Sequence, residues 1–168
     1  MELFSHEIKD INELKQILKN NKEVPENYNI AVIASVFDKE NKLILQRRGS
    51  KCRDERFKLE GIGGGVKETD SDFRSALNRE ILEEVGTDAV IKIEEFITAI
   101  GESTFDLREN KEKYWILLLY KGILEEGELQ IMEPDKNLGY ERYKIGEVDE
   151  DELSTAARKL YSILKERI

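Results

Sequence analysis

The sequence predicts an α/β fold in which a mixed β-sheet lies between helices. Two long apolar stretches, 29–37 and 114–124, predict buried strands, and the first is rich in β-branched residues. Apolar residues at helical spacing predict amphipathic helices at 8–18, before Gly86 and at 153–168. Because the order is helix, strands, helix, strands, helix, the helices must cover both faces of the sheet, which is an α/β/α sandwich.

Composition is typical of a soluble globular protein. The 168 residues are enough for one domain with a sizeable core, and the charged and hydrophobic fractions, 38% and 39%, fit that class. The net charge of −9 argues against nucleic acid or an anionic membrane as the partner. Cys52 is the only cysteine, which excludes an internal disulfide and favours a cytoplasmic location. The polar N-terminus does not predict a signal peptide, and no apolar run approaches the ~20 residues of a membrane span.

Residues 1–28 are expected to form an N-terminal helical extension within a single domain that spans residues 1–168. Five apolar residues recur at helical spacing with lysines between them: Ile8, Ile11, Leu14, Ile17 and Leu18. The polar stretch that follows contains Pro25 and predicts a connector. His6 is the only histidine and has no second His or Cys ligand near it, so a metal-binding role is not expected.

A β-hairpin follows the connector. Residues 29–37 form its first strand, and residues 43–48 return as the second strand, which ends in Arg47 and Arg48. Guanidinium groups match phosphate oxygens with paired donors, and a solvated strand end is an equal alternative for both arginines. Residues 57–60 then predict a short strand that leads into three consecutive glycines.

The segment from Gly63 to Gly86 is the most informative part of the sequence. It starts with a Gly-Gly-Gly turn, whose glycines permit a close approach of the backbone to a ligand. It continues as a helix for which Asp70 or Ser71 is the expected N-cap.

Three carboxylates crowd one face near the end of that helix. Helical residues advance by about 100° each, so Glu80, Glu83 and Glu84 fall within an arc of roughly 100°. Such like charges repel by roughly 0.2–0.5 kcal/mol per pair, which disfavours them in a helix that only has to fold. A hard cation reverses this cost, and Mg²⁺ prefers oxygen ligands and often shares its shell with substrate phosphates. A solvated acidic helix is the alternative, and it leaves the glycines, Arg79 and Gly86 unexplained.

The second half of the chain predicts further strands and a closing helix. After Gly86 an alternating stretch predicts a strand that runs toward a turn near Gly101, and a polar loop precedes the central strand at 114–124. Residues 129–132 predict another short strand, and residues 133–143 predict an acidic loop. One apolar stripe marks the closing helix: Leu153, Ala156, Leu160, Leu164 and Ile168.

The glycine and acidic segment resembles the Nudix box, Gly-x5-Glu-x7-Arg-Glu-U-x-Glu-Glu-x-Gly-U, where U is a bulky aliphatic residue. The second half of the box matches residues 79–86, Arg-Glu-Ile-Leu-Glu-Glu-Val-Gly, and Thr87 replaces the last aliphatic residue. The first half departs further. Placing Gly63 and Gly64 on the family's two glycines puts Asp70 where its first Glu stands, and this alignment requires one extra residue before the second half.

The resemblance implies a Nudix-like hydrolase that cleaves a diphosphate linkage in a nucleoside diphosphate derivative. It implies that Mg²⁺, or Mn²⁺ in its place, is held by Glu83 and Glu84 with the Gly63 or Gly64 carbonyl. Glu80 is then either a third metal ligand or the base that accepts a proton from water. The choice between these two roles varies within the family and stays open.

The resemblance also implies roles for residues around the box. It covers about residues 29–168 and makes Arg47 and Arg48, at the end of their strand, candidate substrate-binding residues near the substrate phosphates. Arg79 is expected to orient a carboxylate of its own helix or the glycine loop through a charge-assisted bond, and the acid at Asp70 is expected to brace that loop. Within the acidic loop 133–143, Glu133 is the candidate for a further metal ligand or base.

Two other functions stay open at this point. A Nudix-like module that binds a nucleotide without cleaving it is expected to have lost box acids, and all three are present. A diphosphate isomerase needs an active-site cysteine, and Cys52 has no histidine near it in the sequence to activate it. The sequence identifies neither the particular nucleotide nor the oligomeric state, and a homodimer is among the options.

Overall fold

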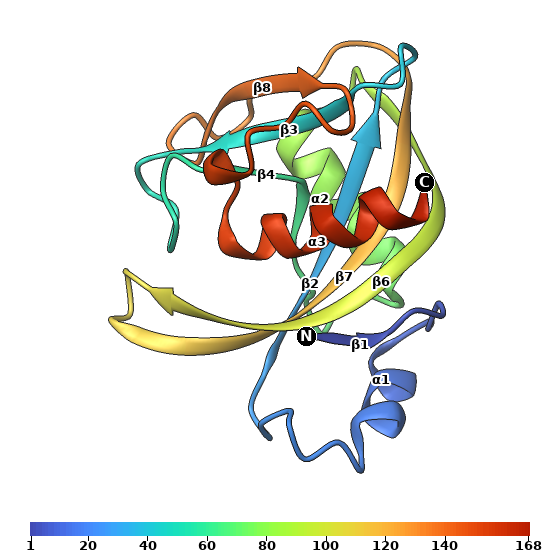
Figure 1. Cartoon of the computed structure of the whole chain (residues 1–168), viewed down its shortest axis with the longest axis vertical. Coiled ribbons are helices and arrows are strands. Elements are labelled where there is room, and N and C mark those ends of the chain that lie inside the picture. Colours follow the sequence, from blue (N-terminus) through green and yellow to red (C-terminus); the bar gives the residue numbers. More distant parts are fainter.

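The computed structural model describes all 168 residues and contains one mixed sheet with helices on both faces (Figure 1). The strands are β1 (Glu2–Phe4), β2 (Asn29–Phe37), β3 (Leu43–Arg48), β4 (Leu59–Glu60), β5 (Ile62–Gly65), β6 (Val90–Asp106), β7 (Lys111–Glu126) and β8 (Asn137–Tyr143). The helices are α1 (Ile11–Leu18), α2 (Phe73–Val85), the 3₁₀ helix η1 (Glu150–Glu152) and α3 (Thr155–Arg167). The sheet order is β1-β6-β7-β2-β3-β4, with β5 paired to β2 and β8 to β3.

Strands β2 and β7 form the centre of the sheet. They run parallel in register, with Asn29 opposite Trp115, whereas the other strand pairs are antiparallel. Successive β2 side chains point to opposite faces. Val32 packs in the core under α2, while Ala31 packs with Leu160 in the core under α3. The predicted α/β/α sandwich is therefore confirmed.

The N-terminal region differs from the expected helical extension in two ways. Residues Glu2–Phe4 form β1, which pairs with β6 at the edge of the sheet. The helix begins at Ile11 rather than near residue 8, because the Asp10 carboxylate accepts a hydrogen bond from the Glu13 amide at 3.0 Å and caps the helix there. Residue Ile8 is still buried in the core, outside the helix.

The turn expected near Gly101 does not form. Strand β6 continues through Gly101 to Asp106, and the chain turns between Asp106 and Lys111. The glycine is needed for space, because a Cβ on it would lie 1.9 Å from the Tyr114 hydroxyl oxygen on the neighbouring strand. The prediction was wrong because Gly101 was interpreted as a turn residue, whereas it makes room for a side chain of the neighbouring strand.

The strand expected at residues 129–132 is also absent. The Gln130 amide donates to the Val85 carbonyl at 2.8 Å, which ties this stretch to the end of α2 instead of to a strand. Strand β8 forms further on, inside the segment expected to be a loop, and pairs with β3. The loop before β8 therefore contains residues 127–136 rather than 133–143.

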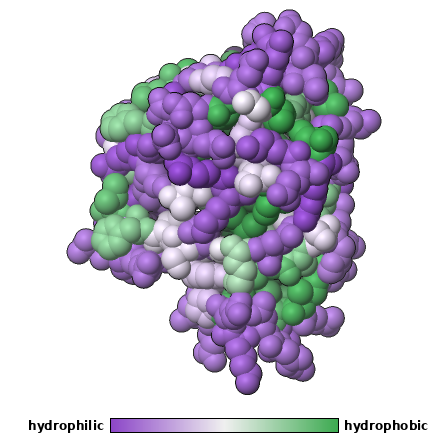
Figure 2. All heavy atoms as spheres, in the orientation of Figure 1, coloured by the Kyte–Doolittle hydropathy of each residue, from purple (hydrophilic) through white to green (hydrophobic).

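Helix α2 is capped by Asp72, not by Asp70 or Ser71. The Asp72 carboxylate accepts from the Ser75 amide at 2.7 Å, while the Asp70 carboxylate is occupied by Arg79. Figure 2 shows a mostly hydrophilic face with small, separated apolar patches. None of the α-helices is long and apolar enough to cross a membrane.

Candidate active site

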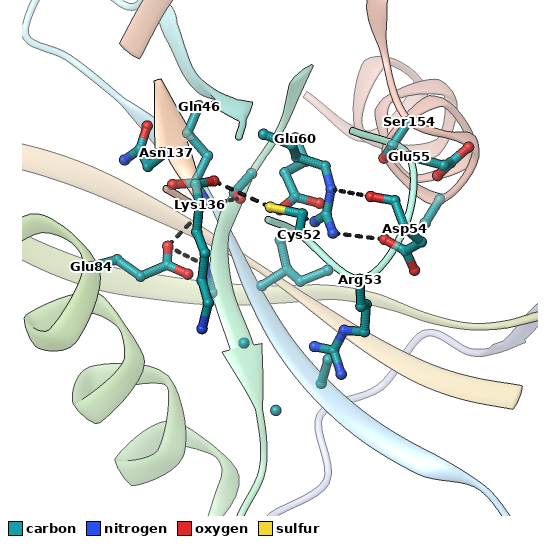
Figure 3. A pocket seen from close by; sticks show the side chains of 18 of the residues that line it. Gln46, Cys52, Arg53, Asp54, Glu55, Glu60, Glu84, Lys136, Asn137 and Ser154 are labelled. Carbon is teal, nitrogen blue, oxygen red and sulfur yellow. Dashed lines mark hydrogen bonds and ion pairs between the residues drawn. The ribbon is translucent and has the colours of Figure 1, made fainter. Parts of the chain in front are cut away.

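A cavity of about 330 Å³ opens where the box helix, the glycine strand and the β3–β4 loop meet (Figure 3). Carboxylates gather at one end, supplied by α2 and β4. The residues of this acidic end are Glu60, Glu80, Glu83 and Glu84. Apolar side chains from β2 and β7 form a floor: Ala31, Ile33, Trp115 and Leu117. The cavity thus combines an acidic wall with an apolar floor.

Glu84 is held against the glycine strand by neutral donors. Its carboxylate accepts from the Gln46 side-chain amide at 3.0 Å and from the Gly63 backbone amide at 3.3 Å. Figure 3 shows Gln46 from β3 and Glu84 from α2 directed toward each other. No lysine or arginine pairs with Glu84, so a partly enclosed carboxylate lies beside other acids without a cation.

Glu80 lies against the next glycine. A Cβ added to Gly64 would sit 2.3 Å from a Glu80 carboxylate oxygen, so only glycine leaves room for this side chain. Glu80 also accepts from the Arg79 guanidinium at 2.9 Å. Glu83, one turn of the helix along, is about half exposed and accepts from Arg79 at 3.3 Å. The three acids therefore differ in burial and in partners.

Burial changes the proton affinity of two of these acids. Burial raises the pKa of Glu84 well above its ordinary value, and the nearby charge of Glu60 raises it further. Burial also raises the pKa of Glu80, although the hydrogen bond from Arg79 opposes the change. Both shifts have the sign expected for carboxylates that are buried near other acids.

Arg79 ties the box helix to the glycine loop. Its guanidinium donates two hydrogen bonds of 2.8 Å to the Asp70 carboxylate and one of 3.0 Å to the Gly65 carbonyl. Asp70 in turn accepts from the Lys67 amide at 2.8 Å. The hydrogen bond from Arg79 lowers the pKa of Asp70. Asp70 thus makes loop-bracing contacts from its own position, one residue before the standard place of the first box Glu.

The side-chain groups at the acidic end of the cavity are suitable ligands for a hard divalent cation. All the side-chain ligands are oxygens, and the buried Glu84 has only neutral hydrogen-bond partners to offset its charge. No three acidic side chains converge at ligand spacing, because Arg79 draws Glu80 and Glu83 toward itself. Mg²⁺ usually keeps several waters, so one or two of these carboxylates are enough to hold it.

The two arginines at the end of β3 are both engaged by carboxylates. Arg47 lies outside the cavity and donates to Glu141 at 2.9 and 3.0 Å. Arg48 lines the cavity, but its guanidinium is bound by Asp54, at 2.6 Å, and by Glu60. The structure therefore brings one of the two to the cavity and leaves neither of them free.

Two further candidates lie near the mouth of the cavity. Glu133 lines it from the loop before β8 and pairs with Lys136 at 3.1 Å, half exposed. Cys52 is buried, and its thiol donates to the Lys136 carbonyl at 3.2 Å. The only histidine, His6, packs on Phe4 and does not line the cavity, so no histidine is available to Cys52 there.

Sequence reasoning missed Glu60 and Gln46. Both lie on neighbouring strands, with Gln46 opposite Glu60 in the β3–β4 ladder, and both reach the acidic end of the cavity. The only local signal was that Gln46 follows three apolar residues in one strand and that Glu60 ends the other. That signal does not reveal a shared site, because the pairing of β3 with β4 is a tertiary property.

Comparisons with known proteins agree with this geometry. The NUDIX domain family model matches residues 27–164. A MutT NUDIX hydrolase from Burkholderia pseudomallei has a similar structure, with a TM-score of 0.64, 21% identity, and coverage of 83% of this chain and 99% of its own. A MutT protein from Methanosarcina mazei has a TM-score of 0.64 at 20% identity, covering 86% and 96%.

A third similar structure was solved with a ligand. The NUDIX domain of NrtR from Shewanella oneidensis, complexed with ADP ribose, has a TM-score of 0.63 at 16% identity, covering 92% of this chain and 97% of its own. No curated protein matches the chain. At these identities the structures show the fold, whereas the family model covers most of the chain. Because the family model covers most of the chain, the chain belongs to the Nudix family.

Proposed function

We propose that this protein hydrolyses the diphosphate linkage of a nucleoside diphosphate derivative with Mg²⁺ as cofactor. The observation that carries the proposal is Glu84, a carboxylate enclosed beside Glu60 and Glu80 that has no cationic partner. A bound cation would compensate the negative charge of Glu84, and an anionic substrate could then bind to that cation. A protein with a net charge of −9 would otherwise repel a diphosphate.

Glu83 and Glu84 would hold the metal with the Gly63 or Gly64 carbonyl, and Glu80 would be either a third metal ligand or the base that accepts a proton from water. When bound, a divalent ion lowers the pKa of a coordinated water and neutralises phosphate oxygens. Mn²⁺ offers the same oxygen-based chemistry as an alternative.

The protein side chains supply the positioning. Gln46 fixes the direction of the Glu84 carboxylate, and Arg79 fixes that of Glu80 while it anchors the glycine loop through Asp70. Glu133, at the mouth, is proposed as a further metal ligand or base.

The lining of the cavity supports the proposed substrate class. Its apolar residues Ala31, Ile33 and Leu117 suit the nucleoside part, while its charged side chains suit a metal-bound diphosphate. A Nudix domain of the same fold binds ADP ribose, which is a nucleoside diphosphate derivative of this kind. Small soluble substrates, a single cysteine and an acidic surface also fit a cytoplasmic protein.

A substrate panel tests the proposal. ADP-ribose, nucleotide sugars, nucleoside triphosphates and dinucleoside polyphosphates are incubated with the protein, with Mg²⁺, with Mn²⁺ and with EDTA. Release of phosphate after a phosphatase step reports cleavage. We expect turnover with Mg²⁺ and none with EDTA. Tight nucleotide binding without cleavage of any compound would instead identify a binding module.

A further inference from the structure

Five basic side chains line the cavity: Arg48, Lys51, Arg53, Arg108 and Lys136. Four of them pair with carboxylates: Arg48 with Asp54 and Glu60, Lys51 with Asp135 at 3.5 Å, Arg108 with Asp106 at 3.9 Å, and Lys136 with Glu133 at 3.1 Å. The guanidinium of Arg53 has no ion pair and donates no hydrogen bond within the protein. In Figure 3 no dashed line reaches it.

Arg53 is nevertheless held in place. Its guanidinium carbon lies 4.4 Å from the centre of the Trp115 ring, on the floor of the cavity. Its backbone carbonyl accepts from the Leu107 amide at 2.6 Å, which joins the β3–β4 loop to the turn between β6 and β7. The ring contact leaves the edges of the guanidinium, where its donors lie, available to a ligand.

A second unpaired polar group lies on the same side of the sheet. The Thr104 hydroxyl oxygen is buried without a hydrogen-bond partner, and Thr104 lines the cavity. Glu102 stands opposite Trp115 in the β6–β7 ladder, and Thr104 is two residues further along β6, so its side chain is on the Trp115 face. Three buried hydroxyls have no hydrogen-bond partner, on Thr104, Tyr114 and Tyr120, and of these residues only Thr104 lines the cavity.

We propose that Arg53, with Thr104 on the Trp115 face of the sheet, binds a phosphoryl group of the substrate, the role that the sequence suggests for Arg47 and Arg48. This proposal rests on the proposed function, since it concerns the same diphosphate. A guanidinium without a protein acceptor is satisfied best by an acceptor-only anion that takes two parallel hydrogen bonds, and phosphoryl oxygens do this. Arg47 and Arg48 hold the β3–β4 loop in place instead.

The single tryptophan provides the test. Trp115 is the only tryptophan of the chain and lies under Arg53, so its fluorescence reports a ligand at this position directly. Magnesium pyrophosphate is titrated into the protein, and calorimetry gives an independent Kd. Loss of a charge-assisted hydrogen bond weakens binding by roughly 10- to 100-fold, so we expect that loss in Arg53→Gln and a smaller one in Arg53→Lys.

Arg56→Gln is the matched control. Arg56 belongs to the same loop but lies outside the cavity and donates to the Cys52 carbonyl at 2.7 Å, so its variant should bind like the parent. Equal Kd values for the parent and Arg53→Gln, with equal Tm values, would overturn the proposal. Arg53-dependent binding of the nucleoside alone, without a response to pyrophosphate, would also overturn it. If pyrophosphate binding depends on Arg53 but no nucleotide is cleaved, the proposed phosphoryl site is supported and only the proposed hydrolase function is contradicted.

Discussion

Arg79 and Asp70 are joined by two hydrogen bonds of 2.8 Å that connect the box helix to the loop after the glycine strand. Asp70 is nearly buried and Arg79 is less than a quarter exposed. The pair therefore has limited solvent screening, and the same guanidinium also holds Glu80 and the Gly65 carbonyl. The stability of this loop and the position of the Glu80 carboxylate therefore both depend on the Arg79 side chain.

Replacing Asp70 with alanine should both destabilise the protein and lower its activity. Removing one partner of a charge-assisted pair costs roughly 1.5–3 kcal/mol, because Arg79 loses two acceptors. Denaturant unfolding measures this loss. Asp135→Ala is the control: its ion pair with Lys51 is about 70% exposed on both sides, so we expect a change within about 0.5 kcal/mol. Equal costs for the two variants would contradict the bracing role.

Glu84→Gln should remove activity while the metal-free protein gains stability. Loss of a metal ligand forfeits several kcal/mol of transition-state stabilisation, a rate loss of about a thousandfold or more. The pKa of Glu84 is raised by burial, so at neutral pH its ionised form opposes folding and a neutral amide does not. Thermal unfolding in EDTA should show a higher Tm.

The half-exposed neighbour Glu83 provides the comparison for Glu84. Glu83→Gln should lower activity as well, because Glu83 is a proposed metal ligand, but it should raise the Tm less. Full activity of Glu84→Gln in Mg²⁺ would refute the assignment of the metal site. A lower Tm in EDTA would refute its electrostatic explanation.

Gly64→Ala should lower activity without unfolding the protein. The new Cβ would meet the Glu80 carboxylate at 2.3 Å, and the side chain has to move away from the glycine strand. A displacement of about 1 Å in a catalytic group can cost roughly a hundredfold in rate. Steady-state kinetics should show the loss in kcat, with a circular dichroism spectrum like the parent's.

Gly65→Ala tests whether that effect is specific. A Cβ on Gly65 would have no heavy atom within 4 Å, so its kcat should fall far less than that of Gly64→Ala. Similar losses in the two variants would show that the glycine strand, rather than the position of Glu80, limits activity.

Asp106 should make the β6–β7 hairpin sensitive to acid. Burial opposes its ionisation, but the ion pair with Lys113 and the hydrogen bonds from the Glu109 and Arg108 amides prevail and lower its pKa from 3.8 to about 2. The folded pKa is depressed, so this contribution to stability is complete above pH 3.8 and disappears as the pH falls toward 2. Unfolding free energies of the parent and Asp106→Asn should differ at pH 6 and converge near pH 2. A difference that is independent of pH would contradict the titration of Asp106.

Periodic and local features were the most predictable from the sequence. The central strands β2 and β7 and the helices α2 and α3 were predicted because apolar spacing is a property of adjacent residues. The errors arose where a tertiary contact overrode the local signal. Gly101 accommodates Tyr114 instead of turning the chain, and the Gln130 amide bonds to the end of α2 instead of to a strand.

The sequence by itself determined the family and the acidic helix face, because the spacing of Glu80, Glu83 and Glu84 on a helix follows from its 3.6-residue repeat. Only the tertiary structure decided which cationic groups are free. Arg47 meets Glu141 across 94 positions of the chain, while Arg53 meets no carboxylate at all. Ion pairs form between residues that the folded strands and loops bring together. Because the two partners are often far apart in the sequence, no local pattern predicts which charges will pair.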